Sequence, residues 1–374
     1  MNSINQPNAT FRHIVLEGTS YECGLALGEH IKAFSAQERA MYTELKPEQS
    51  DMAPEALQAL MALNDRHCPG VSDEIRGMAD GLCVPLPRLA ANLMWHTPAG
   101  CCSHIAVLAD ETVENHTLVA RSYEWSTEDA LCLITTRVIG KYAHIGFSIM
   151  GCGRFDGINE KGLCITMSAG APGKEPTGDG FFFWAAIRAA LDSCATVDEA
   201  VAHISAMPSC FYDNLILTDS LGNAALIEDA CGHRAVKRIG PGSAERHLFS
   251  TNHFTLPGMA ERGSKPMWMS VARHQRIERE FAQRPKASRD SLKALLTAPV
   301  PDGLSCHYYS DWFGTLWSML FDVTDGEVEV CFGSPRANAW HTFGLNDPAG
   351  VTEYPAVLPN ESCADRRFFS TRWE

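Results

Sequence analysis

The fold is decided within the stretch Ala99-Gly100-Cys101-Cys102-Ser103-His104-Ile105-Ala106-Val107. Before this stretch, apolar residues recur at steps of three and four, which predicts helices over 21–45, 54–68 and 72–84. After it, the apolar period becomes two, which predicts strands. A nucleophile would be exposed at such a junction between helix and strand. Cys101 and Cys102 are therefore candidate nucleophiles, because a thiol is the most reactive ordinary side chain at neutral pH.

The rest of the chain alternates between the two patterns. Two-residue periodicity or apolar runs predict strands over 105–108, 117–120, 131–138, 144–149, 163–167, 214–219, 224–229, 235–239, 315–323 and 327–333. Further helices are predicted over 181–194, 196–207 and 270–282, with Thr196 as the cap of the second. Thr324-Asp325-Gly326 predicts a hairpin turn between the last two strands. Helices packed over antiparallel sheets define an α+β layered architecture.

The composition excludes several classes of protein. The chain has 374 residues, 45% of them hydrophobic, which suits one large water-soluble core. A formal charge of -14 without clustered Lys and Arg argues against nucleic-acid binding. No apolar run approaches the roughly 20 residues that span a bilayer, and the polar start Met1 to Arg12 lacks the core of a secretory signal. A cytoplasmic protein without membrane contact is expected.

The fourteen cysteines are scattered along the chain and form no C-x-x-C pair. We therefore expect buried free thiols in a reducing compartment and no structural metal. By the same reasoning, Cys101 and Cys102 could be ordinary core residues without a catalytic role, since free cysteine is often only core packing. If the chain were cut in front of the nucleophile, however, the new α-amine could act as its base, because its ordinary pKa is close to 8.

Several motifs around this junction resemble one family. The segment from Glu17 to Gly28 is similar to G-x-x-Y-E-x-G-x-x-x-G, and the segment from Glu74 to Gly81 to E-x-x-G-x-A-x-G. Residues 119–125 (V-A-R-S-Y-E-W) resemble A-R-S/T-x-D-W, and residues 250–254 (S-T-N-H-F) resemble T-N-H-F/Y. From about residue 15 to 345, the chain thus resembles the isopenicillin-N acyltransferase family, whose relatives include penicillin V acylase, bile-salt hydrolase and acid ceramidase.

The resemblance implies an αββα Ntn-hydrolase sandwich whose precursor cuts itself in front of a cysteine. Family members read Cys-Thr-Ser-Phe/Ile-Ala/Val after the cut. Starting at Cys102 gives Cys-Ser-His-Ile-Ala, with the hydroxyl, aliphatic and small positions in register. Starting at Cys101 breaks that register. We therefore expect cleavage between Cys101 and Cys102, with the Gly100–Cys101 bond as the alternative.

The resemblance also implies the other site residues. The counterparts of Arg121 and Glu124 hold the thiolate and its amine, although most relatives have Asp where Glu124 stands. Without a cysteine upstream, the two would be interpreted as a structural ion pair. The counterpart of Asn252 donates to the oxyanion, which suits acyl transfer. The supporting or substrate-binding candidates are Ser103, Ser168, His253 and Arg273. Ser168 lies on the strand on which bile-salt hydrolases carry an active-site asparagine, which this chain lacks. Arg273 fits a solvated helix face as well as it fits a substrate contact.

The expected organisation is one structural domain, with residues 1–101 as a helical α-chain and residues 102–374 as the catalytic β-chain. The expected activity is hydrolysis or acyl transfer on the amide or thioester of a small N-acyl metabolite, through an acyl-enzyme. The α-chain stays as a partner, and a homo-oligomer is left open. No cofactor is expected, although an acyl-CoA donor would make the protein an N-acyltransferase. The alternatives are a non-catalytic cysteine-rich binding protein and a papain-like protease.

Overall fold

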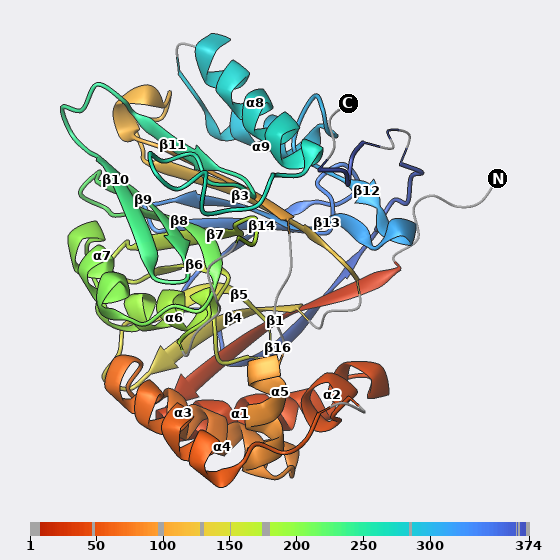
Figure 1. Ribbon diagram of the computed structural model, residues 1–374. Coiled ribbons are helices and arrows are strands. Elements are labelled where there is room, and N and C mark those ends of the chain that lie inside the picture. Colours follow the sequence, from red (N-terminus) through yellow and green to blue (C-terminus); the bar gives the residue numbers. More distant parts are fainter. Residues whose placement is uncertain are drawn as a thin grey trace.

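Two β-sheets are stacked face to face, with helices outside each of them (Figure 1). The computed structural model describes residues 8–46, 49–95, 101–127, 131–149, 151–173, 180–283, 286–363, 365 and 367–371. The helices are α1 (Ser20–Lys32), α2 (Ala36–Thr43), α3 (Pro54–His67), α4 (Val71–Leu82), α5 (Leu86–Trp95), α6 (Phe183–Ser193), α7 (Val197–Ala206), α8 (Trp268–Gln283) and α9 (Arg289–Thr297), with 3-10 turns η1 (Ala109–Glu111) and η2 (Tyr309–Asp311). The strands are β1 (Ala9–Gly18), β2 (Cys101–Val107), β3 (Leu118–Trp125), β4 (Leu131–Val138), β5 (His144–Ile149), β6 (Asp156–Asn159), β7 (Cys164–Ala169), β8 (Tyr212–Thr218), β9 (Ala224–Ala230), β10 (His233–Ile239), β11 (His247–Ser250), β12 (His307–Tyr308), β13 (Phe313–Asp322), β14 (Glu327–Phe332), β15 (Trp340–Phe343) and β16 (Gly350–Ala356).

The two sheets differ in size. Within the described residues, the larger sheet has nine strands in the order β10-β9-β8-β7-β6-β5-β4-β1-β16. The smaller sheet has seven strands, with the order β11-β2-β3-β13-β14-β15 and β12 paired to β13. Strand β2 therefore lies inside the smaller sheet, between β11 and β3. It faces β7 and β8 of the larger sheet.

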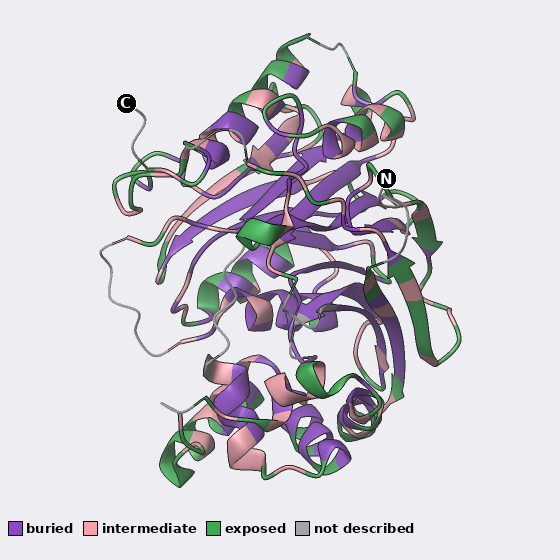
Figure 2. Ribbon diagram, turned by 90° about the vertical axis from the view of Figure 1, so that its right-hand side faces the viewer, coloured by how far each residue is buried: buried purple, intermediate pink, exposed green. Residues whose placement is uncertain are grey.

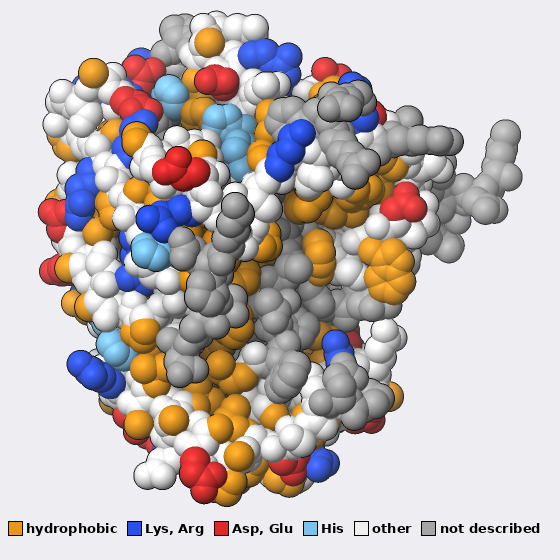
Figure 3. Space-filling model, in the orientation of Figure 1, with side chains coloured by type: hydrophobic (Ala, Val, Ile, Leu, Met, Phe, Trp, Pro, Cys, Tyr) orange, Lys and Arg blue, Asp and Glu red, His pale blue; other side chains and the backbone are white. Residues whose placement is uncertain are grey.

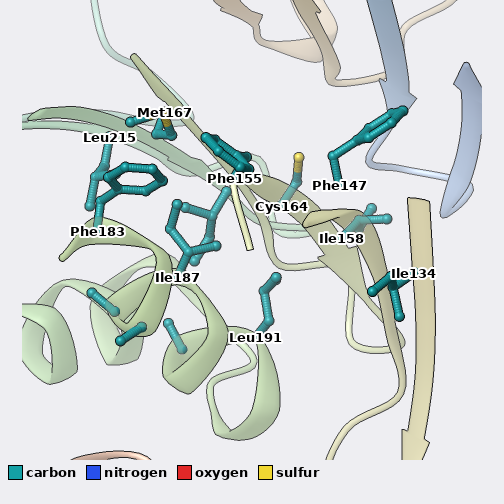
Figure 4. Packing of buried hydrophobic residues seen from close by; sticks show 14 of the residues in the cluster. Ile134, Phe147, Phe155, Ile158, Cys164, Met167, Phe183, Ile187, Leu191 and Leu215 are labelled. Atoms are coloured by element: carbon teal, nitrogen blue, oxygen red, sulfur yellow. The ribbon is translucent and has the colours of Figure 1, made fainter. Parts of the chain in front are cut away.

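Helices cover the outer faces of both sheets. Helices α6 and α7 lie on the larger sheet, α1 to α5 lie beside β1 and β4, and α8 and α9 lie on the smaller sheet (Figure 1). Figure 4 shows why α6 packs as it does: Phe183, Ile187 and Leu191 recur at four-residue steps and point from the helix toward Phe155 and Ile158. Such spacing places apolar side chains on one face of a helix.

The core lies mainly between the sheets, whose central strands are almost wholly buried, whereas the edge strands β10, β15 and β16 are largely intermediate or exposed (Figure 2). The ring of Trp317 lies between two others, with ring centroids 4.0 Å from Tyr123 and 4.0 Å from Phe147. Tyr123 and Trp317 belong to the smaller sheet, and Phe147 belongs to the larger one. Each fully buried aromatic side chain of this kind contributes about 1.5–3 kcal/mol by leaving water. This aromatic stack therefore joins the two sheets.

The expectation that the first hundred residues are helical is wrong at their start. Residues Ala9–Gly18 form β1, which pairs with β4 in parallel and with β16 antiparallel. The run predicted as one helix over 21–45 is also two helices. Helix α1 ends at Lys32, and α2 begins behind Ser35, whose side chain forms a capping box with Glu38. The first hundred residues thus contribute a strand to the inside of the larger sheet.

Of the remaining secondary-structure predictions, some are confirmed, and several short elements were not predicted. Strands β4 and β5 have the predicted bounds, and Thr196 caps α7 through a capping box with Glu199. The predicted hairpin also forms, and Gly326 adopts a φ of 71°, which glycine tolerates. Elements that the sequence did not predict are α5, α9, β6, β11, β12, β15 and β16, and all but α5, α9 and β16 have six residues or fewer. Short elements carry too few periods to stand out. The expected α+β sandwich, with helices outside two stacked sheets, is nevertheless confirmed.

All fourteen cysteines are free thiols, and eleven of them are buried. Within the described ranges, no helix combines the length and apolar character that crossing a bilayer requires.

Candidate functional site

Cys101 and Cys102 open strand β2, and they lie on opposite faces of the smaller sheet. Successive side chains of a strand alternate between the two faces. Cys102 is buried in the core between the sheets, in the same cluster as Tyr123. Cys101 is buried on the outer face, in a cluster with Met269 of α8 and Phe313 of β13. Of the two candidate nucleophiles, Cys102 is thus the one that faces the larger sheet.

A buried guanidinium lies against the Cys102 thiol. Nη2 of Arg121, on the neighbouring strand β3, is 3.7 Å from Sγ of Cys102. Nε of Arg121 donates to Oδ2 of Asp156 at 2.5 Å, and Nη1 donates to the carbonyl of Met167. These two partners belong to β6 and β7 of the larger sheet. Arg121 therefore crosses the gap between the sheets and is fixed at both ends.

The thiol of Cys102 is neutral in the uncut chain at neutral pH. Burial raises its pKa to about 11, and Arg121 acts in the opposite direction because a positive charge favours the thiolate. Burial also raises the pKa of Cys101 to about 12. The cation that lowers the pKa of Cys101 is Arg273, on α8. Arg121 therefore distinguishes the two thiols.

Asn252 and Arg273 hold the backbone of Cys102. The N–H of Cys102 donates to Oδ1 of Asn252 at 3.0 Å. The same oxygen accepts from Nη2 of Arg273 at 2.7 Å, and Nη1 of Arg273 donates to the carbonyl of Cys102 at 2.6 Å. Arg273 is fully buried and also donates to Oγ of Ser103 at 2.7 Å. Of the two interpretations left open for Arg273, the solvated basic helix face therefore does not hold.

The turn that carries Asn252 is fixed by a serine at the start of α8. Oγ of Ser270 accepts a hydrogen bond from the backbone N–H of Asn252 at 2.9 Å. The same hydroxyl is 3.1 Å from Oγ1 of Thr251 and 2.8 Å from Nδ1 of His253. Nδ2 of Asn252 donates to the carbonyl of Ala169, at the end of β7, at 2.8 Å. Asn252 is thus oriented by groups from both sheets and from a helix.

Glu124 lies on the other face of the smaller sheet from Arg121. It pairs with Cys101 across β2 and β3, and one of its oxygens is 3.8 Å from Nη1 of Arg273. The hydroxyl of Thr315 donates to Oε1 at 3.4 Å. Burial raises the pKa of Glu124 to about 7, although Arg273 and its hydrogen bonds oppose this shift. Arg121 and Glu124 therefore flank β2 from opposite sides instead of forming a pair with each other.

Ser168 takes part in a polar network behind Cys102. Its hydroxyl donates to the carbonyl of Thr251 and lies 3.2 Å from Nε2 of His104. Nδ2 of Asn214, its partner on β8, donates to Oγ of Ser168 at 3.1 Å and to the same Thr251 carbonyl. Burial places the pKa of His104 well below its ordinary value, so the ring is neutral. Ser168 therefore supports the turn that precedes Asn252.

His253 lies beside this turn and faces α8. Burial lowers its pKa to about 4, and His274 and Arg273 act in the same direction, so it is neutral near pH 7. Its ring centroid is 5.1 Å from that of His274. The described contacts of His253 are with Thr251 and Ser270, which gives it a supporting position.

Three site residues escaped the sequence analysis. Asp156 is the carboxylate partner of Arg121, Asn214 supports Ser168, and Ser270 orients Asn252. Asp156 opens the segment D-G-I-N-E-K-G-L (156–163), and Ser270 opens the segment S-V-A-R (270–273). Their side-chain contacts are with residues nine or more positions away, so no local pattern reports them. Asn214 lies in an apolar strand and gives no signal of its own.

Among the described residues, one group has the geometry to hold a metal ion: His116, Asp322 and Asp325. Asp322 already accepts from Nη2 of Arg289 at 2.5 Å and from Nδ1 of His116 at 2.7 Å. A guanidinium at this carboxylate opposes a cation there. The group is therefore explained as an ion-pair network.

The fold and the geometry define a two-sheet sandwich whose candidate nucleophile is a cysteine on a strand. A guanidinium faces the sulfur of Cys102, and an amide oxygen faces its backbone nitrogen, which is an arrangement for acyl chemistry. The papain-like alternative is wrong, because its nucleophile begins a helix and Cys102 lies in β2.

Comparisons with known proteins agree with this class. The family described as "Acyl-coenzyme A:6-aminopenicillanic acid acyl-transferase" matches residues 112–337, more than half of the chain. The match includes Arg121, Glu124, Asn252 and Arg273 and begins after Cys102. The chain belongs to this family and is an amide-hydrolysing or acyl-transferring enzyme. This result confirms the resemblance and excludes the non-catalytic binding protein.

Solved structures give more distant similarities, and comparison with curated protein sequences gave no match. Penicillin V acylase from Agrobacterium tumefaciens is 17% identical, covering 69% of this chain and 93% of its own, with a TM-score of 0.42. The N-acylethanolamine-hydrolyzing acid amidase ortholog of Caenorhabditis elegans is 14% identical, with 60% and 93% covered and a TM-score of 0.42. A variant of conjugated bile acid hydrolase from Clostridium perfringens is 12% identical, with 70% and 99% covered and a TM-score of 0.43.

Proposed function

We propose that this chain is the precursor of an N-terminal-cysteine amidohydrolase, which cuts itself between Cys101 and Cys102. Residues 1–101 then form the α-chain and residues 102–374 the catalytic β-chain. The observation that carries the proposal is the contact set of Cys102: Arg121 lies at its sulfur, and Asn252 lies at its backbone nitrogen. The corresponding inner-face contacts are not made by Cys101, whose side chain faces α8.

Self-cleavage begins with the Cys102 thiol. Its sulfur attacks the carbonyl carbon of Cys101, the carbon–nitrogen bond breaks, and the thiol proton moves to the released nitrogen. Water then hydrolyses the thioester, which leaves a carboxyl group on Cys101 and restores the thiol. Oδ1 of Asn252 already accepts a hydrogen bond from the scissile nitrogen, so it supports the released amine in place.

The burial of the thiol explains why the precursor would be inactive toward other amides. In the uncut chain, burial holds the pKa of Cys102 at about 11, so little thiolate exists at pH 7. Cleavage places a free amine on the same residue, and an α-amine with an ordinary pKa near 8 accepts the thiol proton. Arg121 then stabilises the negative sulfur by charge.

Turnover of substrate repeats the first step with a different amide. The sulfur attacks the acyl carbon, the amine of Cys102 passes the proton to the leaving amine, and an acyl thioester remains. Asn252 has two N–H donors on Nδ2, and we assign to this amide part of the stabilisation of the oxyanion. Arg273 holds the Cys102 carbonyl and the Asn252 oxygen, so it fixes the relative position of nucleophile and donor.

Water or an amine can resolve the acyl-enzyme. The family description names an acyl-coenzyme A transferase, which makes acyl transfer from a CoA thioester to an amine the second candidate. The two activities share the thioester and differ in the acceptor. Incubation of the mature protein with an acyl-CoA, with and without an acceptor amine, separates them by whether the new product is an amide or a free acid.

The experiment that tests the proposal is the intact mass of the purified protein together with the N-terminal sequence of its larger fragment. We expect two fragments and Cys102 at the new N-terminus. If Cys101 were found at the new N-terminus, the nucleophile would be Cys101 instead. An uncut protein with full amidase activity would overturn the proposal.

A further inference from the structure

A cavity of about 500 Å³ opens at the end of the smaller sheet where β2 begins. Its walls come from β2, β3, the segments before α8 and β13, and the C-terminal segment. The described lining residues are Cys101, Trp125, Ser126, Met267, Asp311, Trp312, Phe313 and Phe369. Its size lies within the range of small-molecule sites, which are mostly apolar with a few polar groups.

Large apolar side chains are unusually exposed around this cavity. Trp312 is 60% exposed, Phe369 is 43% exposed and Met267 is 38% exposed. Single exposed apolar residues are ordinary, but several around one cavity indicate a binding site. Figure 3 shows hydrophobic side chains gathered at the surface on the side where β12 and β13 lie in Figure 1. The ring of Phe369 packs on that of Phe313, with 5.3 Å between centroids, which ties the rim to the sheet.

The cavity is connected to the nucleophile through two residues. Cys101 forms part of its wall, and its carbonyl carbon is the atom that Cys102 attacks in the proposed self-cleavage. Trp125 packs against both the inter-sheet cluster that contains Cys102 and the outer cluster that contains Cys101. The cavity therefore lies on the acyl side of the proposed scissile bond.

From this position we propose that the cavity binds the acyl group of the substrate, and that this group is apolar and uncharged, either an alkyl chain or an aryl ring. The inference rests on the proposed function. Self-cleavage and substrate turnover use the same sulfur, so both bring an acyl carbon to it. A substrate amide that takes the place of the Cys101–Cys102 peptide directs its acyl group to the side on which Cys101 lies.

The charge of the lining defines the class further. Asp311 is the one charged residue among the described lining residues, and it is exposed at the rim. The described lining holds no cation to offset this negative charge, so a carboxylate on the acyl chain would be repelled by it and would lose its hydration. Acyl groups that end in a carboxylate are therefore disfavoured relative to neutral groups of equal length.

Kinetics with a series of 4-nitroanilides tests the proposal, because the amine stays constant while the acyl group changes. The series contains the acetyl, hexanoyl, phenylacetyl and 5-carboxypentanoyl anilides. Burial of a methylene group favours binding by about fourfold, so kcat/KM for the hexanoyl anilide should exceed that for the acetyl anilide by more than about tenfold. The 5-carboxypentanoyl anilide should fall well below the hexanoyl anilide. Equal kcat/KM for the acetyl and hexanoyl anilides would overturn the proposal.

Variants of the rim locate the effect. Trp312 has a φ of 64°, so Trp312→Asn removes the ring while keeping a residue that tolerates this conformation. This variant and Phe369→Ser should both lower the ratio of kcat/KM between the hexanoyl and acetyl anilides by at least about threefold, which is less than the effect of one buried methylene. The matched control is Leu221→Ser, which removes a side chain that is 66% exposed in the turn between β8 and β9. An unchanged ratio in both rim variants would place the acyl group elsewhere.

A binding measurement separates this inference from the proposed function. 2-Heptanone imitates the hexanoyl group without a bond to cleave, and its binding is followed by the fluorescence of the tryptophans, two of which line the cavity. We expect saturable binding in the wild-type protein that is weakened at least about tenfold in Phe369→Ser and absent with acetone. If no anilide is cleaved, the proposed function fails, and this titration alone decides the cavity. Absence of 2-heptanone binding would overturn the cavity as an acyl site.

Discussion

The backbone nitrogen of Cys102 donates a hydrogen bond to Oδ1 of Asn252 across 3.0 Å, although 150 residues separate the two in the sequence. The acceptor end of the amide thus faces the candidate nucleophile in the uncut chain, and the donor end faces the carbonyl of Ala169. In the proposed cycle, the same side chain therefore has two separable roles, as acceptor for the amine and as donor to the oxyanion.

Substitution of Asn252 tests those two roles separately. Asn252→Ala removes both, so we expect slower self-cleavage and, in the cleaved fraction, a loss in kcat equivalent to about 2.7–4 kcal/mol. Asn252→Asp keeps an oxygen for the amine and loses the amide donor, so it should mature faster than Asn252→Ala while its kcat stays low. Fragment ratios and single-substrate kinetics measure both. Near-normal kcat in a cleaved Asn252→Ala protein would show that another group stabilises the oxyanion.

The identity of the nucleophile is tested by three variants compared side by side. Cys102→Ala should give a folded, uncut and inactive precursor, whereas Cys101→Ala should still mature, because its side chain faces α8. Cys102→Ser should cleave partially and turn over little substrate, since a hydroxyl attacks more slowly than a thiol. Gel electrophoresis and acyl release give the readouts. If Cys101→Ala is the uncut variant and Cys102→Ala is active, the assignment is wrong.

Ser270 should act as a positioning residue for Asn252. Ser270→Ala leaves the buried N–H of Asn252 without its hydroxyl acceptor, which costs about 1–3 kcal/mol. Because the turn loses its register with Cys102, we expect kcat to fall more than KM rises. Ser264→Ala removes an exposed hydroxyl from the segment before α8 and serves as the control. A lowered melting temperature with unchanged kcat would reduce Ser270 to a purely structural role.

Arg121 should have two separable roles: it stabilises the fold by pairing with Asp156, and it serves the chemistry as the cation beside the thiolate. Arg121→Met leaves the Asp156 carboxylate buried without its main partner, which costs about 3–5 kcal/mol in stability. Adding Asp156→Asn removes the uncompensated charge, so the double variant should recover much of the unfolding free energy. It should not recover activity, because the thiolate still lacks its cation. Recovery of both by the double variant would show that Arg121 is needed only for folding.

Because its pKa is raised in the folded chain, Glu124 should make the free energy of unfolding fall as the pH rises. The pKa of this carboxyl is about 7 in the folded chain against an ordinary 4.5, because burial disfavours its charge. The stabilisation is therefore fully present below about pH 4.5 and is lost as the pH rises through 7. Glu124→Gln imitates the protonated acid, so its unfolding free energy should fall less between pH 5 and pH 8 than that of the wild type.

Chemical denaturation at the two pH values measures this difference, and Glu55→Gln, at an exposed position in α3, is the control. Parallel pH dependence in the wild type and Glu124→Gln would mean that Glu124 is ionised at neutral pH, as a direct partner of Arg273.

The sequence by itself determined what local pattern can carry. The change of period at Cys101 and Cys102 located the start of β2, and the order of the motifs identified the family that the match to residues 112–337 confirms. Strands β4 and β5 and the cap of α7 by Thr196 also followed from neighbouring residues. These features depend on side chains within a few positions of each other, which is the range that periodicity and capping report.

The tertiary structure alone decided which groups meet. It placed Arg121 and Glu124 on opposite faces of one sheet, although only two residues lie between them, and it supplied Asp156 and Ser270 as the partners that orient the site. It also placed residues Ala9–Gly18, in a segment expected to be helical, as strand β1 inside the larger sheet. Sheet pairing and the stacking of two sheets join residues that are distant in the chain, so the energy that selects these contacts is absent from any local stretch of sequence.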